Sequence, residues 1–341
     1  MKKEDEKLGG WEAEMAETGV DFYSLYELII EVRWEGEGIE DELEQFFSSF
    51  PFTQVGGSGH AADVTLHFAA TDTPLKTPYS QVTPLSFYDL SIYEMGGSVY
   101  ISDGLSSFYA QPQAGMGQIT LYGRGKESHR VSKHNLFLVG LFHLLPYQNL
   151  YHLHAAGLVR DEKGYLFIGE SGSGKSSLSL SLVRQGWRYL SDDVLLFRPS
   201  MNGVEALSFR KQFFLDPALS RHYHEISAHL EETPYGDDTK QLFDVESVYP
   251  DQFSSNCFPR ILIFTRIVPH AESALVPIDR ASVMVRLMQQ SATLFFNRQV
   301  VRAHADALKR LLYQTTHYQL FAGVDLREDP AKISEILGCH E

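Results

Sequence analysis

The stretch Gly169-Glu170-Ser171-Gly172-Ser173-Gly174-Lys175-Ser176 decides the fold class of this chain. It fits the pattern G-x-x-x-x-G-K-[ST] at every fixed position. The apolar run 165–168 before it predicts a buried strand. Residues 177–184 after it predict a helix, because Leu178 and Leu182 lie one turn apart and Gly186 is suited to end it. Strand, loop and helix in this order predict a P-loop within an α/β domain.

A loop of this kind binds phosphate through its backbone. Glycines let the chain approach the anion closely, and several N–H groups converge on it with the positive end of the following helix. Lys175 is expected to reach the β and γ phosphates, and the Ser176 hydroxyl to bind Mg²⁺. The sequence therefore predicts a nucleoside triphosphate and Mg²⁺ as ligands, and the loop leaves the base of the nucleotide open. The predicted nucleotide contacts are Gly169, Glu170, Ser171, Gly172, Ser173, Gly174, Lys175, Ser176 and Ser177.

Two adjacent acids follow the loop. Asp192 and Asp193 lie between a predicted short strand at 187–190 and a predicted strand at 194–197. One carboxylate can hold Mg²⁺ while the other accepts the proton of an attacking hydroxyl. A turn at a strand end would explain a single aspartate equally well, but a pair directly after a P-loop favours metal and base.

Three segments together resemble the core of the HPr kinase/phosphorylase family. They are His154-Ala155-Ala156-Gly157, the glycine loop 169–176, and Ser191-Asp192-Asp193-Val194, in this order and spacing. The resemblance covers roughly residues 150–200 and implies a fold similar to the nucleotide-binding domain of phosphoenolpyruvate carboxykinase. On this basis we expect an α/β P-loop kinase domain with a smaller α+β domain before it.

The resemblance also implies roles for single residues. Lys175 and the loop amides would hold phosphate, and Ser176 with Asp193 would hold the metal. Asp192 would be the general base toward a serine, although the two aspartates could exchange roles. His154 would lie near the γ phosphate, whereas His152 is expected to be a bystander.

The implied activity is an ATP-dependent serine kinase whose acceptor is a serine-containing peptide or small protein. A subfamily with this core tailors lasso-peptide precursors. The family's later glycine-rich signature with arginine is absent from this sequence, which puts the reverse, phosphorylase reaction in doubt, and the N-terminal half shows no specific match. Two alternatives stay open: an ATP-binding regulatory protein without catalysis, and a kinase acting on a small molecule.

Two cations outside these motifs are candidate phosphate or substrate contacts. Lys240 lies in the polar, turn-rich segment 234–244, and Arg210 follows a predicted strand at 204–209. An ordinary exposed lysine and a charged strand end are the plainer explanations. A run at 260–264 predicts another strand of the central sheet.

The N-terminal part has a different pattern. Val64, Leu66 and Phe68 alternate with polar residues, which predicts a half-buried strand, and the pair Gly96-Gly97 between two apolar runs predicts a hairpin. We therefore expect a strand-rich α+β domain at 1–148, for substrate or partner recognition, and the kinase domain at 149–341. Near the C-terminus, a helix is expected with Asp329 as its N-cap and Gly338 at its end.

Composition limits the partners. The 341 residues include 29 basic and 44 acidic side chains, a formal net charge of −15, which disfavours nucleic acid. The longest apolar stretch, 135–146, is too short for a membrane span and predicts a buried helix. Residues 1–7 do not resemble a signal peptide, and Cys257 and Cys339 lack a metal-ligand spacing, so a cytoplasmic protein with reduced thiols is expected. Homo-oligomer formation is left open.

Overall fold

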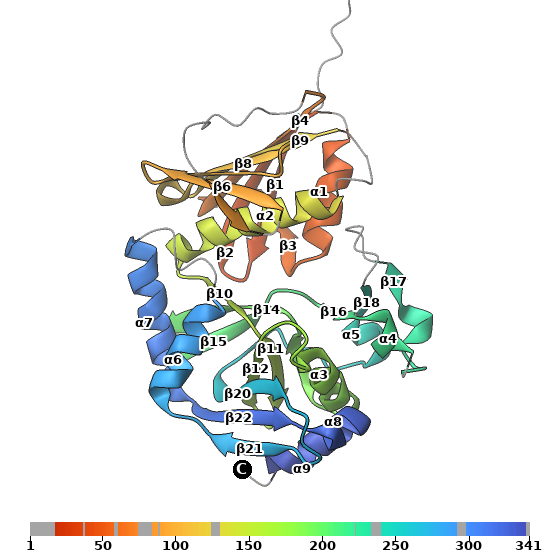
Figure 1. Cartoon of the computed structure of the whole chain (residues 1–341). Coiled ribbons are helices and arrows are strands. Elements are labelled where there is room, and N and C mark those ends of the chain that lie inside the picture. Colours follow the sequence, from red (N-terminus) through yellow and green to blue (C-terminus); the bar gives the residue numbers. More distant parts are fainter. Residues whose placement is uncertain are drawn as a thin grey trace, which may run out of the picture.

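The computed structural model describes residues 18–36, 38–57, 61–73, 84–87, 89–123, 130–221, 223–232, 240–291 and 298–338. These residues form two lobes (Figure 1). The upper lobe contains the described residues up to 148, and the lower lobe contains those from 151 onward. Mixed α/β structure agrees with the expected fold class, while the assignment of separate functions to 1–148 and 149–341 stays a prediction.

The described strands of the upper lobe join into one twisted sheet. They are β1 (Thr18–Leu25), β2 (Leu28–Glu35), β3 (Phe52–Val55), β4 (Val64–Thr71), β5 (Leu85–Phe87), β6 (Leu90–Met95), β7 (Ser98–Ser102), β8 (Ser107–Gln111) and β9 (Met116–Tyr122). Their order is β3-β1-β2-β4-β9-β8-β7-β6-β5. The central strands β2, β4 and β9 run parallel, and the other neighbours run antiparallel.

Local sequence accounts for these strands. Val64, Leu66 and Phe68 point to the buried face of β4, which confirms the predicted alternation. The predicted hairpin joins β6 to β7, and both Gly96 (φ 59°) and Gly97 (φ 86°) have the positive φ that a tight primed turn requires.

Two helices pack between this sheet and the lower lobe (Figure 1). They are α1 (Ile39–Ser48) and α2 (Arg130–Leu144), and the turn η3 (Leu145–Gln148) follows α2. The buried helix predicted at 135–146 is confirmed as α2. A Cβ at Gly140 of α2 would lie 2.2 Å from the Phe108 ring of β8, so glycine permits this close contact of helix and sheet. A further short turn, η1 (Pro112–Ala114), joins β8 to β9.

The lower lobe contains the predicted central sheet. Its strands are β10 (Tyr151–His154), β11 (Ala156–Arg160), β12 (Lys163–Ile168), β13 (Arg188–Ser191), β14 (Val194–Ser200), β15 (Gly203–Ser208), β16 (Gln212–Leu215), β17 (Glu231–Glu232), β18 (Gln241–Asp244), β19 (Asn256–Cys257), β20 (Pro259–Ile267), β21 (Ala274–Pro277) and β22 (Thr316–Ala322). The strands expected at 165–168, 194–197 and 260–264 are thus confirmed as parts of β12, β14 and β20.

Within the described residues these strands form three sheets. The central one has the order β13-β11-β12-β20-β22-β21, and the others have the orders β10-β14-β15-β19 and β16-β18-β17. In the central sheet β12, β20 and β22 are parallel, whereas β11, β13 and β21 pair antiparallel. The parallel strands bring the loops after β12 and β20 to the same edge of the sheet.

Helices flank the central sheet on both sides, and α4 and α5 lie beside the small sheet β16-β18-β17 (Figure 1). The described helices of the lower lobe are α3 (Lys175–Arg184), α4 (Pro217–Ser220), α5 (Val245–Val248), α6 (Arg280–Gln289), α7 (Arg298–Gln314), α8 (Val324–Glu328) and α9 (Ile333–Gly338), with the turns η4 (Ser227–His229) and η6 (Pro330–Lys332). Asp329 is an N-cap as predicted, since its side chain accepts from Ala331 N at 3.1 Å. It caps η6, a 3₁₀ turn, and α9 follows.

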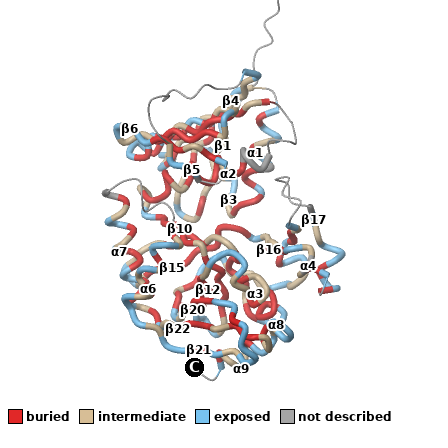
Figure 2. The backbone as a smooth tube through the Cα atoms, in the orientation of Figure 1, coloured by how far each residue is buried: buried red, intermediate tan, exposed pale blue. Residues whose placement is uncertain are grey.

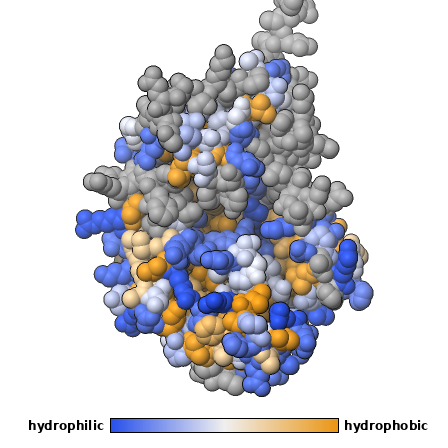
Figure 3. Space-filling model, in the orientation of Figure 1, coloured by the Kyte–Doolittle hydropathy of each residue, from blue (hydrophilic) through white to orange (hydrophobic). Residues whose placement is uncertain are grey.

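The apolar core of the upper lobe continues into the lower one. Besides sheet and helix residues of the upper lobe, this core includes Leu196, Leu207 and Phe209 from β14, β15 and the residue after β15. The buried segments lie in the sheets and at the junction of the two lobes (Figure 2). The surface of the lower lobe intersperses hydrophilic and apolar side chains in the view of Figure 3. No helix in the described segments combines the length and apolar character that a membrane crossing requires.

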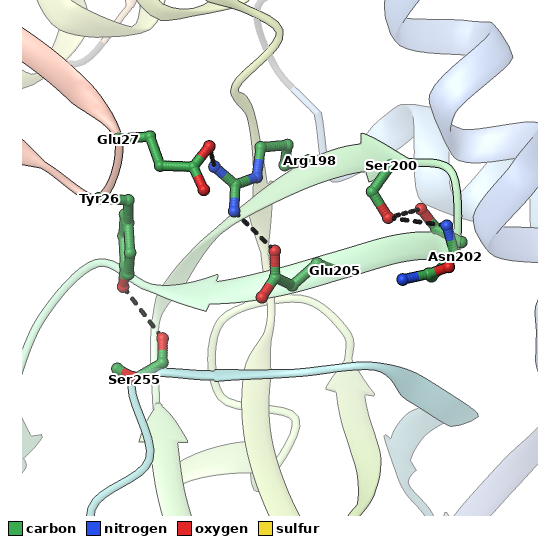
Figure 4. A network of polar contacts seen from close by, with 8 residues as sticks. Tyr26, Glu27, Arg198, Ser200, Asn202, Glu205 and Ser255 are labelled. Atoms are coloured by element: carbon green, nitrogen blue, oxygen red, sulfur yellow. Dashed lines mark hydrogen bonds and ion pairs between the residues drawn. The ribbon is translucent and has the colours of Figure 1, made fainter.

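Polar contacts also join the lobes (Figure 4). The Tyr26 hydroxyl, in the turn between β1 and β2, donates to the carbonyl of Ser255 at 3.0 Å and also contacts that of Ser208. Arg198 of β14 pairs with Glu27 at 2.8 Å and with Glu205 of β15 at 2.9 Å. The hairpin of β14 and β15 therefore contributes several of the contacts between the lobes.

Candidate functional site

The glycine loop, residues 169–174, connects β12 to α3 as the sequence predicted. Gly172 (φ 76°) and Gly174 (φ 91°) take left-handed conformations that favour glycine, and Gly174 is the N-cap of α3. At Gly169, a Cβ would lie 2.6 Å from Ser173 Oγ and 2.7 Å from Thr265 Oγ1, so the loop packs tightly against the end of β20. The Ser173 and Thr265 hydroxyls are hydrogen-bonded at 2.9 Å.

Lys175, the first residue of α3, folds its side chain back onto this loop. Its Nζ donates to the carbonyls of Gly169 at 2.7 Å and Glu170 at 3.0 Å, and the residue is only 6% exposed. Burial lowers the pKa of Lys175 below its usual range, although the nearby carboxylates of Asp193 and Asp192 act in the opposite direction. The ammonium group is thus bonded to the loop carbonyls, and the charges of both acids act on it.

Asp192 is held by groups of the lower lobe. It follows β13, is 4% exposed, and its Oδ1 accepts from the Tyr189 hydroxyl at 3.0 Å while its Oδ2 accepts from Phe214 N at 3.0 Å. Burial, followed by the negative charge of Asp193, raises the pKa of Asp192 to about 7. A carboxylate with this pKa can exchange a proton near neutral pH.

Asp193 has a different environment. Its Oδ1 lies 3.0 Å from His154 Nδ1, and the two side chains are 40% and 34% exposed. Burial acts to raise the pKa of Asp193, but the hydrogen bond and charge of His154, with Arg210 and Lys240 beyond, hold it below its usual range. The pairing of β10 with β14 places His154 opposite Val194 and so beside Asp193. His152, the expected bystander, is buried and stacks on Phe142 at 4.3 Å between ring centroids.

The two candidate cations lie in different surroundings. Lys240 is exposed just before β18, and its charge reaches both Asp193 and Lys175. Arg210 is 7% exposed, and its Nη2 lies 2.8 Å from His134 Nε2 of α2. The structure therefore places Arg210 inside the contact between the lobes, rather than at an open strand end as the plainer explanation assumed.

A metal site can be assessed from the donors present. Ser176, the second residue of α3, is partly buried, and Asp193 is an accessible carboxylate. The described residues contain no cluster of three or more His, Cys, Asp and Glu side chains that could hold a metal alone. Mg²⁺ bound with a nucleotide needs few protein ligands, because phosphate oxygens and water complete its coordination. The donor set at Ser176 and Asp193 fits this kind of site.

A pocket of about 540 Å³ opens beside the glycine loop. Its lining comes from the glycine loop residues 169–173, from the end of β20, from the end of α6 and from Gln319 of β22. Polar groups in it include Arg286, whose Nη1 donates to Gln319 Oε1, and Gln319, whose Nε2 donates to Phe264 O at 2.6 Å. Neither aspartate lines this pocket, but His154, the partner of Asp193, donates its backbone N–H to the carbonyl of Gln290 in the pocket lining at 3.0 Å.

Sequence reasoning missed several residues of the site. Tyr189 and Phe214 hold Asp192, and Arg286 and Gln319 line the pocket. None of these residues belongs to a spaced motif, so only the three-dimensional structure could have found them. Thr265 and Arg266, which directly follow the strand predicted at 260–264, also line the pocket.

Comparisons with known proteins give little further guidance. No family model matches the chain, and no curated protein matches it. One similar solved structure is the Hpr(Ser) kinase/phosphatase of Coxiella burnetii, with 16% sequence identity over 55% of this chain and 95% of that chain, and a TM-score of 0.30. A TM-score of this size does not by itself establish a shared fold.

Proposed function

We propose that the protein is an ATP-dependent kinase that transfers the γ-phosphoryl group to a serine hydroxyl of a peptide or small protein. The observation that carries the proposal is the convergence of three features: the glycine loop with Lys175, the buried Asp192, and the pair of Asp193 with His154. A loop alone is compatible with nucleotide binding of any kind. Two aspartates with opposite pKa shifts beside it add the groups that a transfer reaction needs.

The residues divide the work according to their environments. The loop amides and Lys175 bind the phosphates, and the nucleoside extends into the pocket of about 540 Å³ beside the loop. Asp192 accepts the proton of the serine hydroxyl, since its pKa of about 7 makes it a base near neutral pH. Lys240, whose charge reaches Asp193 and Lys175, neutralises negative charge that develops during transfer.

Asp193 and Ser176 would hold Mg²⁺. The lowered pKa of Asp193 keeps its carboxylate ionised, as a metal ligand must be, and His154 fixes its orientation by the 3.0 Å contact. When bound, the ion supplies positive charge that offsets the charge of the triphosphate. The proposal of a peptide acceptor follows from the motif resemblance. A lasso-peptide precursor is one example of such an acceptor.

One observation favours a second function, nucleotide binding without transfer. Both oxygens of Asp192 accept internal hydrogen bonds, and the residue is only 4% exposed, as a structural aspartate would be. In that case the same loop would report the nucleotide state to a partner. The two functions differ in whether phosphate leaves ATP for an acceptor.

Phosphate transfer by the wild type and by Asp192→Asn tests the proposal. MgATP binding is measured by calorimetry, and transfer to serine-containing peptides and HPr is followed by mass spectrometry. We expect transfer by the wild type and a loss of about a hundredfold or more in the variant, with ATP affinity retained. Asp193→Asn serves as the companion variant, because loss of a metal ligand should weaken MgATP binding as well.

Tight MgATP binding without transfer to any acceptor would replace the kinase with the regulatory function. Transfer to free serine but to no peptide would keep the kinase and change the acceptor class. Unchanged transfer by Asp192→Asn with strongly reduced transfer by Asp193→Asn would exchange the roles of the two aspartates.

A further inference from the structure

We propose that Arg210 is a positioning residue for phosphotransfer, through which the upper lobe holds Asp192 in place. This inference rests on the proposed function and adds a role for the upper lobe in the reaction. It concerns the segment 208–214, which runs from the end of β15 into β16. One end of this segment contacts the upper lobe, and the other end contacts Asp192.

The first end is held by three residues of the upper lobe. The Tyr26 hydroxyl contacts the Ser208 carbonyl, and the guanidinium of Arg210 lies 5.6 Å from the ring centroid of Phe50. Arg210 Nη2 lies 2.8 Å from His134 Nε2. Because arginine can only donate, the histidine nitrogen is the acceptor. These contacts come from the β1–β2 turn, from the turn after α1 and from α2, so separate elements of the upper lobe contact the segment.

The second end reaches the catalytic aspartate. The Phe214 N–H donates to Asp192 Oδ2 at 3.0 Å, and the Tyr189 hydroxyl lies 3.0 Å from Asp192 Oδ1 and 2.9 Å from the Gln212 carbonyl. The Arg210 guanidinium also covers the Phe214 ring at 4.8 Å. Arg210 thus contacts the upper lobe on one side and, on the other, the residue whose backbone orients Asp192.

Burying Arg210 has a free-energy cost that a purely structural role does not explain. It is 7% exposed, its Nε has no hydrogen-bond partner, and the ion pairs found among the described residues do not include it. The charge of Arg210 still acts on both aspartates, since it lowers the pKa of Asp192 and that of Asp193. An apolar side chain of similar volume would fill the same space without the cost of burying a cation. The presence of arginine here favours a role in orienting the site.

The test compares variants at both ends of this contact in the full chain. Arg210→Met removes the charge and keeps the volume, and His134→Leu removes the acceptor from the partner side. His134→Gln is the conservative variant, because its amide oxygen can still accept from arginine. Arg198→Met is the matched control, since Arg198 also bridges the lobes but pairs with Glu27 and Glu205. For each we measure kcat for transfer, MgATP affinity and Tm.

We expect Arg210→Met and His134→Leu to lower kcat about tenfold or more while MgATP affinity stays within about twofold of wild type. His134→Gln should recover most of kcat, and Arg198→Met should lower Tm without lowering kcat. If Arg210→Met does not fold, the comparison of His134→Leu with His134→Gln tests the positioning role by itself.

If Arg210→Met and His134→Leu change kcat no more than the control Arg198→Met does, the inference is overturned while the kinase function stands. A loss that appears only in MgATP affinity, or that His134→Gln does not recover, would also overturn it. Absence of transfer in the wild type is a separate result, because it would overturn the proposed function first.

Discussion

Replacing His304 with leucine should make the stability of the protein less sensitive to acid. His304 lies in α7, is 0% exposed, and neither ring nitrogen has a hydrogen-bond partner among the described residues. Its ring packs 4.9 Å from that of Tyr151 and 5.3 Å from that of Phe197, measured between centroids. Burial lowers the pKa of His304 from 6.5 to about 4, because the apolar surroundings disfavour the imidazolium.

The sign and size of the effect follow from this shift. The folded pKa lies below the unfolded value, so the contribution of His304 to the free energy of unfolding is complete above about pH 6.5 and is lost as the pH falls toward about 4. At about pH 5 the loss amounts to about 2 kcal/mol for this one group. His143 and His152, with pKa values lowered by burial to about 4 and about 3, add losses in the same direction.

Urea unfolding at about pH 7.5 and about pH 5 measures the effect. Wild type should lose about 2 kcal/mol more than His304→Leu between the two pH values. The exposed His229, replaced by leucine, is the control and should keep the wild-type pH dependence. If wild type and His304→Leu lose the same free energy to within about 0.5 kcal/mol, then His304 is not a buried neutral histidine and the reasoning is wrong.

Three further outcomes are expected. Lys175→Met should weaken MgATP binding about tenfold or more in calorimetry, since the ammonium group of the loop is lost, while far-UV circular dichroism stays unchanged. Gly140→Ala should destabilise the protein by about 1–3 kcal/mol in thermal unfolding, because the new Cβ would lie 2.2 Å from the Phe108 ring; an unchanged Tm would contradict the packing described. Transfer activity should fall as the pH drops through about 7, where Asp192 becomes protonated. Tyr189→Phe should move this acid limb of the pH–activity profile to higher pH, because the tyrosine hydroxyl stabilises the carboxylate. An acid limb that does not move would argue against Asp192 as the base.

Local sequence was sufficient for the elements whose pattern lies within a few neighbouring residues. The glycine loop between β12 and α3 follows from glycine and lysine at fixed spacing, and the β6–β7 hairpin follows from Gly96-Gly97. Alternation identified β4, and a long apolar run identified α2. In each case the residues that determine the conformation are the residues that adopt it.

The environments of the site residues required the tertiary structure. The sequence singled out His154 and Asp193, but their contact depends on the pairing of β10 with β14. It also offered Asp192 and Asp193 as an interchangeable pair, and only their surroundings separate the buried acid with a raised pKa from the accessible one with a lowered pKa.

The same holds for Arg210, whose sequence neighbours suggest a solvated strand end. Its actual partner, His134, is 76 positions away along the chain and belongs to the other lobe. Sequence spacing therefore determined which residues could bind phosphate, because a loop and a helix start are local structures. Packing between distant segments decided which of the other charged groups are buried, paired or free to act, because burial and pKa depend on everything that surrounds a side chain.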